Sequence, residues 1–377
     1  MLDTSWKEHI FQNNHNLKGK HVVVRVDWNL PINEGVITDA SRFEVTIPFI
    51  KELSLAGAKI ILLTHYGEKG ESLKQIADYA IKHLPFISFV DTFDFNELRK
   101  KSNELAEGNA MLLENVRMWE GETDNLPSLA KDFASLGNIF INDAFSVSHR
   151  NHASVVGIAE NMLSYFGPTF VRELENLSKI LEPEKPALLI IGGAKISTKL
   201  SLIERYLTQG IHVFVGGAMV HNIWVAEGIK IGKSLYDHDY KLSSNFINNP
   251  LLITPIDVVL DTGEKVSYDK IPEDATVVDV GEDTVKILEK IIDESKTVIA
   301  NGPLGLYEKG WIQGSEKILN KLAHSSATTY IGGGDTVALT HSLHLLTKMN
   351  FVSLGGGAML DFLTFGTMPG INAVTKQ

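Results

Sequence analysis

Residues 141–154, with the sequence INDAFSVSHRNHAS, place His149, Arg150 and His152 close together just after an apolar run. Arginine presents a planar fork of N–H donors that matches the oxygens of carboxylates and phosphates. The chain carries 46 acidic and 35 basic side chains and a formal charge of −11, so this cationic cluster is a local feature. The chemistry that these residue types favour is the binding of a small anion.

Arginine is unevenly distributed along the chain, which supports an anion site in the first half. The seven arginines are at positions 25, 42, 99, 117, 150, 172 and 205, and lysine supplies the positive charge beyond them. Arg25 and Asp27 are two residues apart on a predicted strand and therefore face the same way. That spacing is compatible with a plain salt bridge or with a shared role in binding.

Glycine marks the second half of the chain. Five apolar runs end there in Gly-Gly or Asn-Gly-Pro, at residues 187–193, 212–217, 297–303, 328–334 and 350–357. Bare backbone N–H groups before a helix suit phosphates, so this set predicts a nucleotide or phosphate crevice. No G-x-G-x-x-G motif is present, and EGIKIGKS has Glu227 where a Walker loop needs glycine. Both observations disfavour a hydride-transfer enzyme and a P-loop NTPase.

Charged residues accompany these glycines. Lys195 and Lys199 in GGAKISTKL would share one face of a helix that begins there, and an anion between them would offset the unfavourable helix dipole. Asp335 follows three glycines, where it could cap a helix or bind Mg²⁺. Glu308 in NGPLGLYE could bind a ribose hydroxyl or simply be a solvated loop acid. The proline of this motif stiffens the turn that presents Asn301.

The elements that must position these residues alternate between strand and helix patterns. In the first half we predict strands at 21–29, 58–65, 86–90, 111–117 and 138–145, with amphipathic stretches between them. This alternation predicts an α/β fold with parallel sheets covered on both faces. Ligands bind at the carboxyl ends of such strands. The first half offers Asp27, Asn29, His65, Asn115, Arg117 and the segment of His149 and Arg150 at those ends.

Length and composition limit the remaining possibilities. A chain of 377 residues predicts two domains, and PTFVRELENLSKILEPEKPALLI is typical of a charged connecting helix with a proline-punctuated exit. The absence of cysteine excludes disulfides and thiolate metal sites, and no pair of histidines has metal-ligand spacing together with a helical carboxylate, which disfavours zinc. The N-terminal residues lack a signal-peptide pattern, and the apolar runs are shorter than the roughly 20 residues of a membrane span. We therefore expect a cytoplasmic protein whose acidity disfavours nucleic acid and membrane partners.

Ten segments of the chain, in order, resemble the signature blocks of the phosphoglycerate kinase family. They are RVDWNLP, LTHYGEKG, LLENVRMWEGE, INDAFSVSHRNHAS, IIGGAKISTKL, VGGAMV, GIKIGKS, ANGPLGLYE, YIGGGDTV and SLGGGAML. The resemblance implies two Rossmann-like, doubly wound parallel-sheet domains joined by a helix and hinge. Their expected extents are 1–168 with 366–377 packing back onto it, 169–185 for the connector, and 186–365.

The resemblance also implies a function and a set of site residues. The expected reaction is the glycolytic, reversible transfer between 1,3-bisphosphoglycerate and ADP that gives 3-phosphoglycerate and ATP with Mg²⁺, in a monomer. The phosphoglycerate site would use Asp27, Asn29, Arg42, His65, Arg117 and Arg150. The nucleotide site would use Gly193, Lys199, Gly216, Gly217, Asn301, Pro303, Glu308, Gly333, Gly334, Asp335 and Thr336. Asp335 would bind the metal, and Arg42, Lys195, Gly334 and Gly357 would surround the transferred phosphoryl group.

The chain departs from the family pattern at several positions. Glu68 stands where the family has a substrate-binding arginine, AFSVSHR replaces Ala-Phe-Gly-Thr-Ala-His-Arg, and Ala300 and Leu354 replace a tryptophan and a threonine. Two other functions therefore remain alternatives at this point. One is a catalytically lapsed nucleotide-binding or scaffold protein, and the other is a kinase for a different small phosphorylated carboxylic acid.

Overall fold

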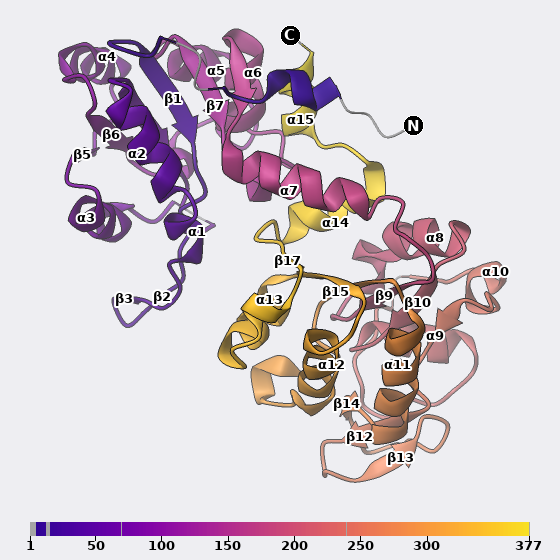
Figure 1. The fold of residues 1–377 in the computed structure, drawn as a ribbon. Coiled ribbons are helices and arrows are strands. Elements are labelled where there is room, and N and C mark those ends of the chain that lie inside the picture. Colours follow the sequence, from indigo (N-terminus) through magenta and orange to yellow (C-terminus); the bar gives the residue numbers. More distant parts are fainter. Residues whose placement is uncertain (1–4, 13–15, 69, 239, 377) are drawn as a thin grey trace. The chain divides into compact units, whose positions relative to one another are not determined.

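The computed structural model describes residues 5–12, 16–68, 70–238 and 240–376. The chain forms two compact units, one within residues 1–175 and 365–377 and the other within residues 176–364 (Figure 1). Each unit contains a six-stranded parallel sheet with helices packed against it. The predicted α/β fold with two parallel-sheet units is therefore confirmed.

The sheet of the first unit has the strand order β5-β6-β4-β1-β7-β8. Its strands are β1 (His21–Arg25), β4 (Lys59–Leu63), β5 (Ile87–Val90), β6 (Ala110–Leu113), β7 (Ile139–Asn142) and β8 (Ser164–Phe166), and β2 (Ile32–Asn33) and β3 (Val36–Ile37) form a separate hairpin. Its helices are α1 (Ser41–Glu44), α2 (Ile47–Leu55), α3 (Lys74–His83), α4 (Phe95–Glu104), α5 (Pro127–Ala134), α6 (Ile158–Asn161) and α15 (Pro369–Thr375). Shorter turns are η1 (Ser5–His9), η2 (Val116–Met118), η3 (Phe145–Val147) and η4 (Ala153–Gly157).

The second unit has the strand order β11-β10-β9-β15-β16-β17 and a small antiparallel sheet, β13-β12-β14. Its strands are β9 (Ala187–Ile191), β10 (His212–Val215), β11 (Leu252–Ile253), β12 (Asp257–Leu260), β13 (Lys265–Ser267), β14 (Val277–Val280), β15 (Thr297–Asn301), β16 (Thr328–Gly332) and β17 (Phe351–Val352). Its helices are α8 (Leu200–Thr208), α9 (Met219–Ala226), α10 (Ser244–Ile247), α11 (Glu282–Glu294), α12 (Gln313–Ala323), α13 (Gly334–Ser342) and α14 (Gly357–Phe365), with turns η5 (Ile196–Thr198), η6 (Tyr307–Lys309) and η7 (Leu346–Lys348).

Continuous apolar runs form the central strands, because a parallel strand covered by helices on both faces is buried on both. In β1 every residue after His21 is buried, and all five residues of β15 are buried. Alternate residues such as Val22 and Val24 pack with Phe49 and Ile50 of α2 in one core. In the second unit Val298 of β15 packs with α11 and α12 through a similar core.

The observed strands are shorter than the predicted ones, and the antiparallel sheet β12–β14 was not predicted. The predicted strand 111–117, for example, ends at Leu113, since Val116–Met118 form the turn η2. Asn115 starts that turn, because its side-chain oxygen accepts a hydrogen bond from the N–H of Arg117 at 3.0 Å. A side-chain acceptor that competes with the strand ladder in this way ends extended structure.

Strand register brings the predicted site residues to one edge of each sheet. Arg25, which ends β1, is paired with Leu63 of β4 and with Asn142 of β7. Asn301, which ends β15, is paired with Ile191 of β9 and with Gly332 of β16. Because neighbouring strands end at the same level, the residues that follow them lie side by side at the carboxyl edge.

The helix α7 (Pro168–Lys179) starts in the first unit and ends in the second, and the unit boundary at residue 175 lies within it. Asp143, which follows β7, accepts hydrogen bonds at its Oδ1 from the N–H groups of Thr169 at 2.7 Å and Phe170 at 3.1 Å. Its Oδ2 is buried and has no partner among the described residues. Burial raises the pKa of Asp143 to about 7, although these hydrogen bonds oppose the shift.

The raised pKa of Asp143 predicts a pH-dependent stability. Because the folded-state pKa lies above the ordinary value of 3.8, this group stabilises the fold most below pH 4, and the contribution is lost as the pH rises through about 7. The free energy of unfolding of Asp143→Asn should therefore depend less on pH than that of the wild type. Over the whole range between the two pKa values, the contribution of Asp143 is at most about 4 kcal/mol. Urea unfolding at pH 5 and pH 8 measures it. The control is the exposed Asp124→Asn, and an unchanged slope in Asp143→Asn would contradict the assignment.

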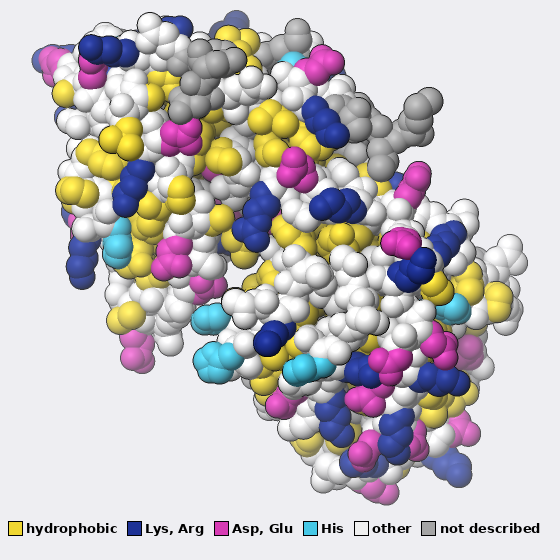
Figure 2. Space-filling view, viewed as in Figure 1, with side chains coloured by type: hydrophobic (Ala, Val, Ile, Leu, Met, Phe, Trp, Pro, Cys, Tyr) yellow, Lys and Arg dark blue, Asp and Glu magenta, His cyan; other side chains and the backbone are white. Residues whose placement is uncertain are grey.

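The exposed face of the second unit carries mixed charges. Figure 2 shows Lys and Arg side chains interspersed with Asp and Glu over the region of α11 and α12. Ion pairs there join Lys265 and Lys317 to Glu282, and Lys321 to Asp293. Within the described ranges, no helix combines the length and apolar character needed to cross a bilayer.

Candidate active site

Asp27, Arg42 and His65 meet at the carboxyl edge of the first sheet. Arg42 Nη1 donates to Asp27 Oδ2 at 2.6 Å, and His65 Nδ1 lies 3.8 Å from Asp27 Oδ1. The hydroxyl of Ser146, from η3, also donates to Asp27 Oδ2. Asp27 therefore orients both the guanidinium and the imidazole, and the Arg42 side chain remains 31% exposed.

The electrostatics of this group favour an ionised carboxylate beside a neutral imidazole. Burial alone would raise the pKa of Asp27, but Arg42, His65 and the hydrogen bond from Ser146 lower it below its ordinary value. Burial lowers the pKa of His65, and Arg25, Arg150 and Arg42 add to that effect against the attraction of Asp27. The ring of His65 is thus neutral near pH 7 and offers hydrogen bonds rather than charge.

Two other predicted residues meet at the turn that follows β4. The N–H of Gly67 donates to Asn29 Oδ1 at 3.1 Å, and Arg117 Nη1 donates to the carbonyl oxygen of Gly67. Asn115 supports this turn by donating to the carbonyl oxygen of Tyr66 at 2.6 Å. Asn29 and Arg117 are therefore held at one loop.

Arg150 completes the cationic edge of the first unit. Its Nε lies 3.4 Å from His149 Nε2, and its charge contributes to lowering the pKa values of both His65 and His152. Burial is the larger cause for His152, whose pKa falls to about 4. The arrangement places guanidinium donors beside neutral imidazoles, which suits a small anion with several oxygens.

A buried hydrogen-bond network of Arg25, Ser154 and Glu122 contacts His65 at the carboxyl edge of the first sheet. Arg25 is 1% exposed, and its Nε donates to Ser154 Oγ at 3.1 Å while its Nη2 lies 3.5 Å from His65 Nδ1. Ser154 in turn donates to Glu122, both from its N–H and from its hydroxyl. Asp27 pairs with Arg42 and His65 among the described ion pairs, so the salt bridge considered between Arg25 and Asp27 does not form. Arg25 and Asp27 both approach His65 Nδ1, at 3.5 and 3.8 Å, and their charges attract each other without a direct ion pair.

Glycine is required where the strands of the second sheet end. A Cβ on Gly192 would collide with the carbonyl oxygen of Pro303, and one on Gly217 would lie 2.7 Å from the Gly193 nitrogen. Gly193 and Gly217 also have positive φ values of 126° and 63°. Only glycine fits such close backbone approaches, and the result is a crevice lined by main chain.

Lys199 and Asp335 lie at this crevice. Lys199 Nζ donates to the carbonyl oxygen of Gly192 at 2.6 Å, and burial lowers its pKa to about 8 although the charge of Asp335 opposes the shift. The helix α8 begins only at Leu200, and the turn η5 separates Lys195 from Lys199, so the two lysines do not share the first helical turns. Gly333 is the N-cap of α13, which corrects the alternative in which Asp335 caps it.

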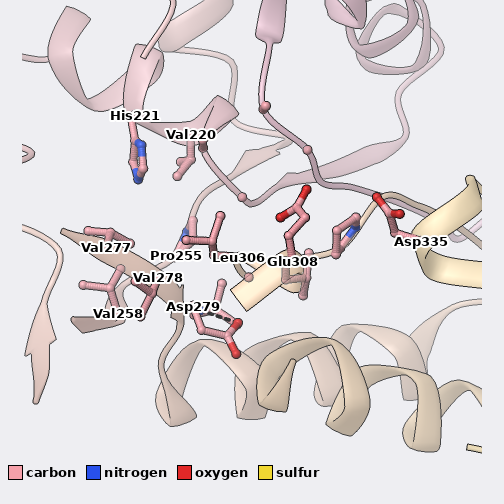
Figure 3. Close-up of a pocket in the computed structure, with 18 of the residues that line it drawn as sticks. Val220, His221, Pro255, Val258, Val277, Val278, Asp279, Leu306, Glu308 and Asp335 are labelled. Carbon is pink, nitrogen blue, oxygen red and sulfur yellow. Dashed lines mark hydrogen bonds between the residues drawn. The ribbon is translucent and has the colours of Figure 1, made fainter. Parts of the chain in front are cut away.

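A cavity of about 250 Å³ opens beside these residues (Figure 3). Gly193, Gly217, Pro303, Glu308 and Asp335 line it, together with apolar side chains from α9, β12 and β14. Figure 3 shows Glu308 pointing into the space and Asp335 at one end of it. A charged, glycine-rich end and an apolar end suit a phosphorylated ligand that also carries a flat ring.

Comparison with known proteins identifies the family. The model of the family described as "Phosphoglycerate kinase" matches residues 12–365. The chain belongs to the phosphoglycerate kinase family. It is 36% identical to the phosphoglycerate kinase of Listeria innocua, covering 96% of this chain and 98% of that one. It is 35% identical to that of Chelativorans sp., covering 96% and 97%.

Solved phosphoglycerate kinases have the same fold. The structure from Coxiella burnetii is 32% identical, with a TM-score of 0.83 over 96% of this chain and 98% of that one. The structure from Pyrococcus horikoshii is 26% identical, also with a TM-score of 0.83, over 97% and 98%. The chain is thus an enzyme, a kinase, with the two-domain fold of the phosphoglycerate kinases.

The remaining predicted residues occupy the carboxyl edge of the second sheet. Gly216 directly follows β10, and its N–H donates to Ile191 at 2.9 Å. Asn301 is 3% exposed at the end of β15, and Gly333, Gly334 and Thr336 open α13. The Thr336 hydroxyl oxygen is buried without a partner among the described residues. Lys195 is exposed and precedes η5, and Gly357 is the first residue of α14. Neither residue is among those that line the cavity.

Sequence reasoning missed several residues of both sites. Ser146, Ser154 and Glu122 support the first site, and His221 and Trp224 line the cavity of the second. The segment AFSVSHR, which contains Ser146, differs from the family pattern, and this departure was a signal that could have pointed to Ser146. His221 and Trp224 lie within an apolar helical stretch that reads as ordinary core.

Proposed function

We propose that this chain catalyses the phosphoglycerate kinase reaction of glycolysis, with 3-phosphoglycerate bound by the first unit and the nucleotide by the second. The observation that carries the proposal is the family match over residues 12–365, combined with two sites of opposite chemistry. We take 1–168 with 366–377 as the phosphoglycerate domain, 169–185 as the connector and 186–365 as the nucleotide domain. We propose that the protein acts as a monomer.

The first site would bind an anion with several oxygens. Arg42, Arg117 and Arg150 would supply charged donors, while the neutral His65 would supply a hydrogen bond. Asp27 and Asn29 would accept hydrogen bonds from the hydroxyl of phosphoglycerate. The carboxylate that attacks the phosphoryl group is already ionised, so the reaction needs no general base. It needs positioning and charge neutralisation instead.

The second site would bind ATP or ADP. Backbone N–H groups at the glycine-lined crevice, the start of α13 and Lys199 would contact the phosphates, and Glu308 would contact the ribose. Lys195, Arg42, Gly334 and Gly357 would surround the phosphoryl group during transfer. The hydroxyl of Thr336, which has no partner among the described residues, would add a further hydrogen bond to the nucleotide.

Asp335 fits a magnesium ion that is shared with the nucleotide phosphates. It is exposed at the start of α13 and lines the cavity, and Mg²⁺ in phosphoryl-transfer sites is usually bound by one or two carboxylates plus phosphates. In the described part of the chain no cluster of three or more His, Asp or Glu would bind a metal by itself. When bound, Mg²⁺ would neutralise phosphate charge.

A coupled assay tests the proposal. With ATP and 3-phosphoglycerate at saturating concentrations, the purified protein should form 1,3-bisphosphoglycerate, and a chelator of Mg²⁺ should abolish the activity. Absence of product at saturating substrate would contradict the proposal. Nucleotide binding without phosphoglycerate binding would then support the catalytically lapsed alternative.

Glu68 favours one second candidate, a kinase for a different small phosphorylated acid. It is exposed in the turn after β4 and directly follows Gly67, which contacts both Asn29 and Arg117. An acid there repels a phosphate that a family arginine would attract. Assays of wild type beside Glu68→Arg distinguish the two candidates. A large gain in affinity for 3-phosphoglycerate supports the usual substrate, whereas faster turnover of another acyl phosphate by wild type supports the second candidate.

A further inference from the structure

Two buried polar atoms at the wall of the nucleotide cavity have no hydrogen-bond partner among the described residues, His221 Nε2 and Trp224 Nε1. His221 is 2% exposed and Trp224 is 0% exposed. They are three residues apart on α9, so they share one side of the helix, and both line the cavity. Figure 3 shows His221 at the end of the cavity away from Asp335. Buried polar groups are normally paired, so these two atoms are candidates for hydrogen bonds to a molecule that enters the cavity.

The hydrogen bond on the other side of the ring decides what His221 offers. Its Nδ1 lies 2.7 Å from the carbonyl oxygen of Leu235, which can only accept, so Nδ1 carries the proton. Burial lowers the pKa of His221 despite that hydrogen bond, so the ring is neutral near pH 7. Nε2 is therefore an acceptor, and Trp224 Nε1–H is a donor.

The surroundings of these two atoms suit a flat heteroaromatic ring. Val220, Val258, Val277 and Leu306 provide apolar walls around this end of the cavity. The carboxylate of Asp279, also in the wall, already accepts hydrogen bonds from the N–H groups of Val280 at 2.8 Å and Gly314 at 2.9 Å. His221 and Trp224 therefore supply the acceptor and the donor that remain for a base.

We propose that His221 Nε2 accepts a hydrogen bond from the exocyclic 6-amino group of a purine, and that Trp224 Nε1–H donates to a neighbouring ring nitrogen. The site would thereby select adenine nucleotides over 6-keto purines, an inference that rests on the proposed nucleotide site. Adenine carries its amino donor next to the acceptor N7, whereas a 6-keto purine presents two acceptors along that edge. If a keto oxygen faced His221 Nε2, both atoms would be acceptors and neither would be hydrogen-bonded. Burying two unpaired acceptors weakens binding.

Calorimetry on the full chain at pH 7.5 tests this selection with three probes: ADP, IDP and purine riboside 5′-diphosphate, which has hydrogen at position 6. ADP should bind about tenfold or more tightly than IDP, with the unsubstituted purine between them. In His221→Phe the ratio of the ADP and IDP affinities should fall towards one. His212→Phe, a change in the same unit but outside the cavity, is the matched control and should keep the wild-type ratio.

The outcomes separate this inference from the proposed function. Equal binding of ADP and IDP by wild type overturns the inference and leaves the proposed function intact. If neither ADP nor IDP binds, the inference and the proposed function are both overturned. If His221→Phe does not fold, the relative affinities of the three nucleotides for the wild type still test the inference. The ¹⁵N chemical shifts of the His221 ring give a further test, because a protonated Nε2 in the free protein would overturn the assignment.

Discussion

Replacing Arg42 with methionine is expected to lower kcat/KM for 3-phosphoglycerate by about 30- to 5,000-fold. Removing one partner of a hydrogen-bonded charge pair at a binding site costs about 2–5 kcal/mol, much of it from the partner left behind. Here that partner is Asp27, whose side chain is 10% exposed and also holds His65. Methionine preserves the length and apolar character of the arginine stem, so the loss is chiefly one of charge and hydrogen bonds.

Two measurements show whether the effect of Arg42→Met is local to substrate binding. The Kd of ADP, determined by calorimetry, should stay at the wild-type value, because we place the nucleotide on the other unit. Arg99→Met is the matched control, since Arg99 also pairs with an aspartate, Asp132, at 3.4 Å on an exposed surface. If both variants keep wild-type kcat/KM, Arg42 does not belong to the phosphoglycerate site.

Lys199→Met should weaken nucleotide binding and lower kcat/KM for ATP by about 30- to 1,000-fold. The Lys199 ammonium is partly buried beside Asp335, and its loss removes positive charge where we place the phosphates. The exposed Lys290→Met on α11 is the control for loss of a lysine charge. Retention of wild-type nucleotide affinity by Lys199→Met would remove this residue from the site.

The lowered pKa of Lys199 adds a pH dependence to the same test. Phosphates prefer the protonated amine, so nucleotide affinity should be full below pH 8 and fall as the pH rises through about 8. It should be about tenfold weaker one unit above that pKa. Arginine stays charged throughout this range, so Lys199→Arg should show a flat profile between pH 7 and pH 9. Identical slopes in wild type and Lys199→Arg would contradict the role of Lys199.

Much of the fold could be predicted from the sequence, because buried parallel strands produce unbroken apolar runs. The runs containing Val22 and Val298 are cases in point, and both became central strands. Strand ends were predicted too late, since side chains such as that of Asn115 start turns inside apolar segments. The sheet β12–β14 was missed because its strands are short and only partly buried.

The sites could be predicted less completely, for a different physical reason. Sequence order indicates which residues follow a strand, so Asp27 and His65 could be assigned to one edge, where they lie 3.8 Å apart. It does not indicate which tertiary partner a side chain selects. Arg25 and Asp27 face the same way by spacing, yet Ser154, 129 residues away, is the hydrogen-bond partner of Arg25. The sequence also does not show that His221 Nδ1 bonds to the carbonyl oxygen of Leu235, which leaves Nε2 as the free acceptor.

The first unit is built from two stretches that are distant in sequence, since residues 365–376 belong to it together with the N-terminal part of the chain. Helix α15 packs against η1 and η4, and the N–H of Gly370 donates to the carbonyl oxygen of Ser148, next to His149 and Arg150. Residues 176–364 form one contiguous stretch, so the second unit draws on no segment from elsewhere in the chain. The first unit is complete only once α15 has been synthesised, so its folding cannot finish from residues 1–175 alone.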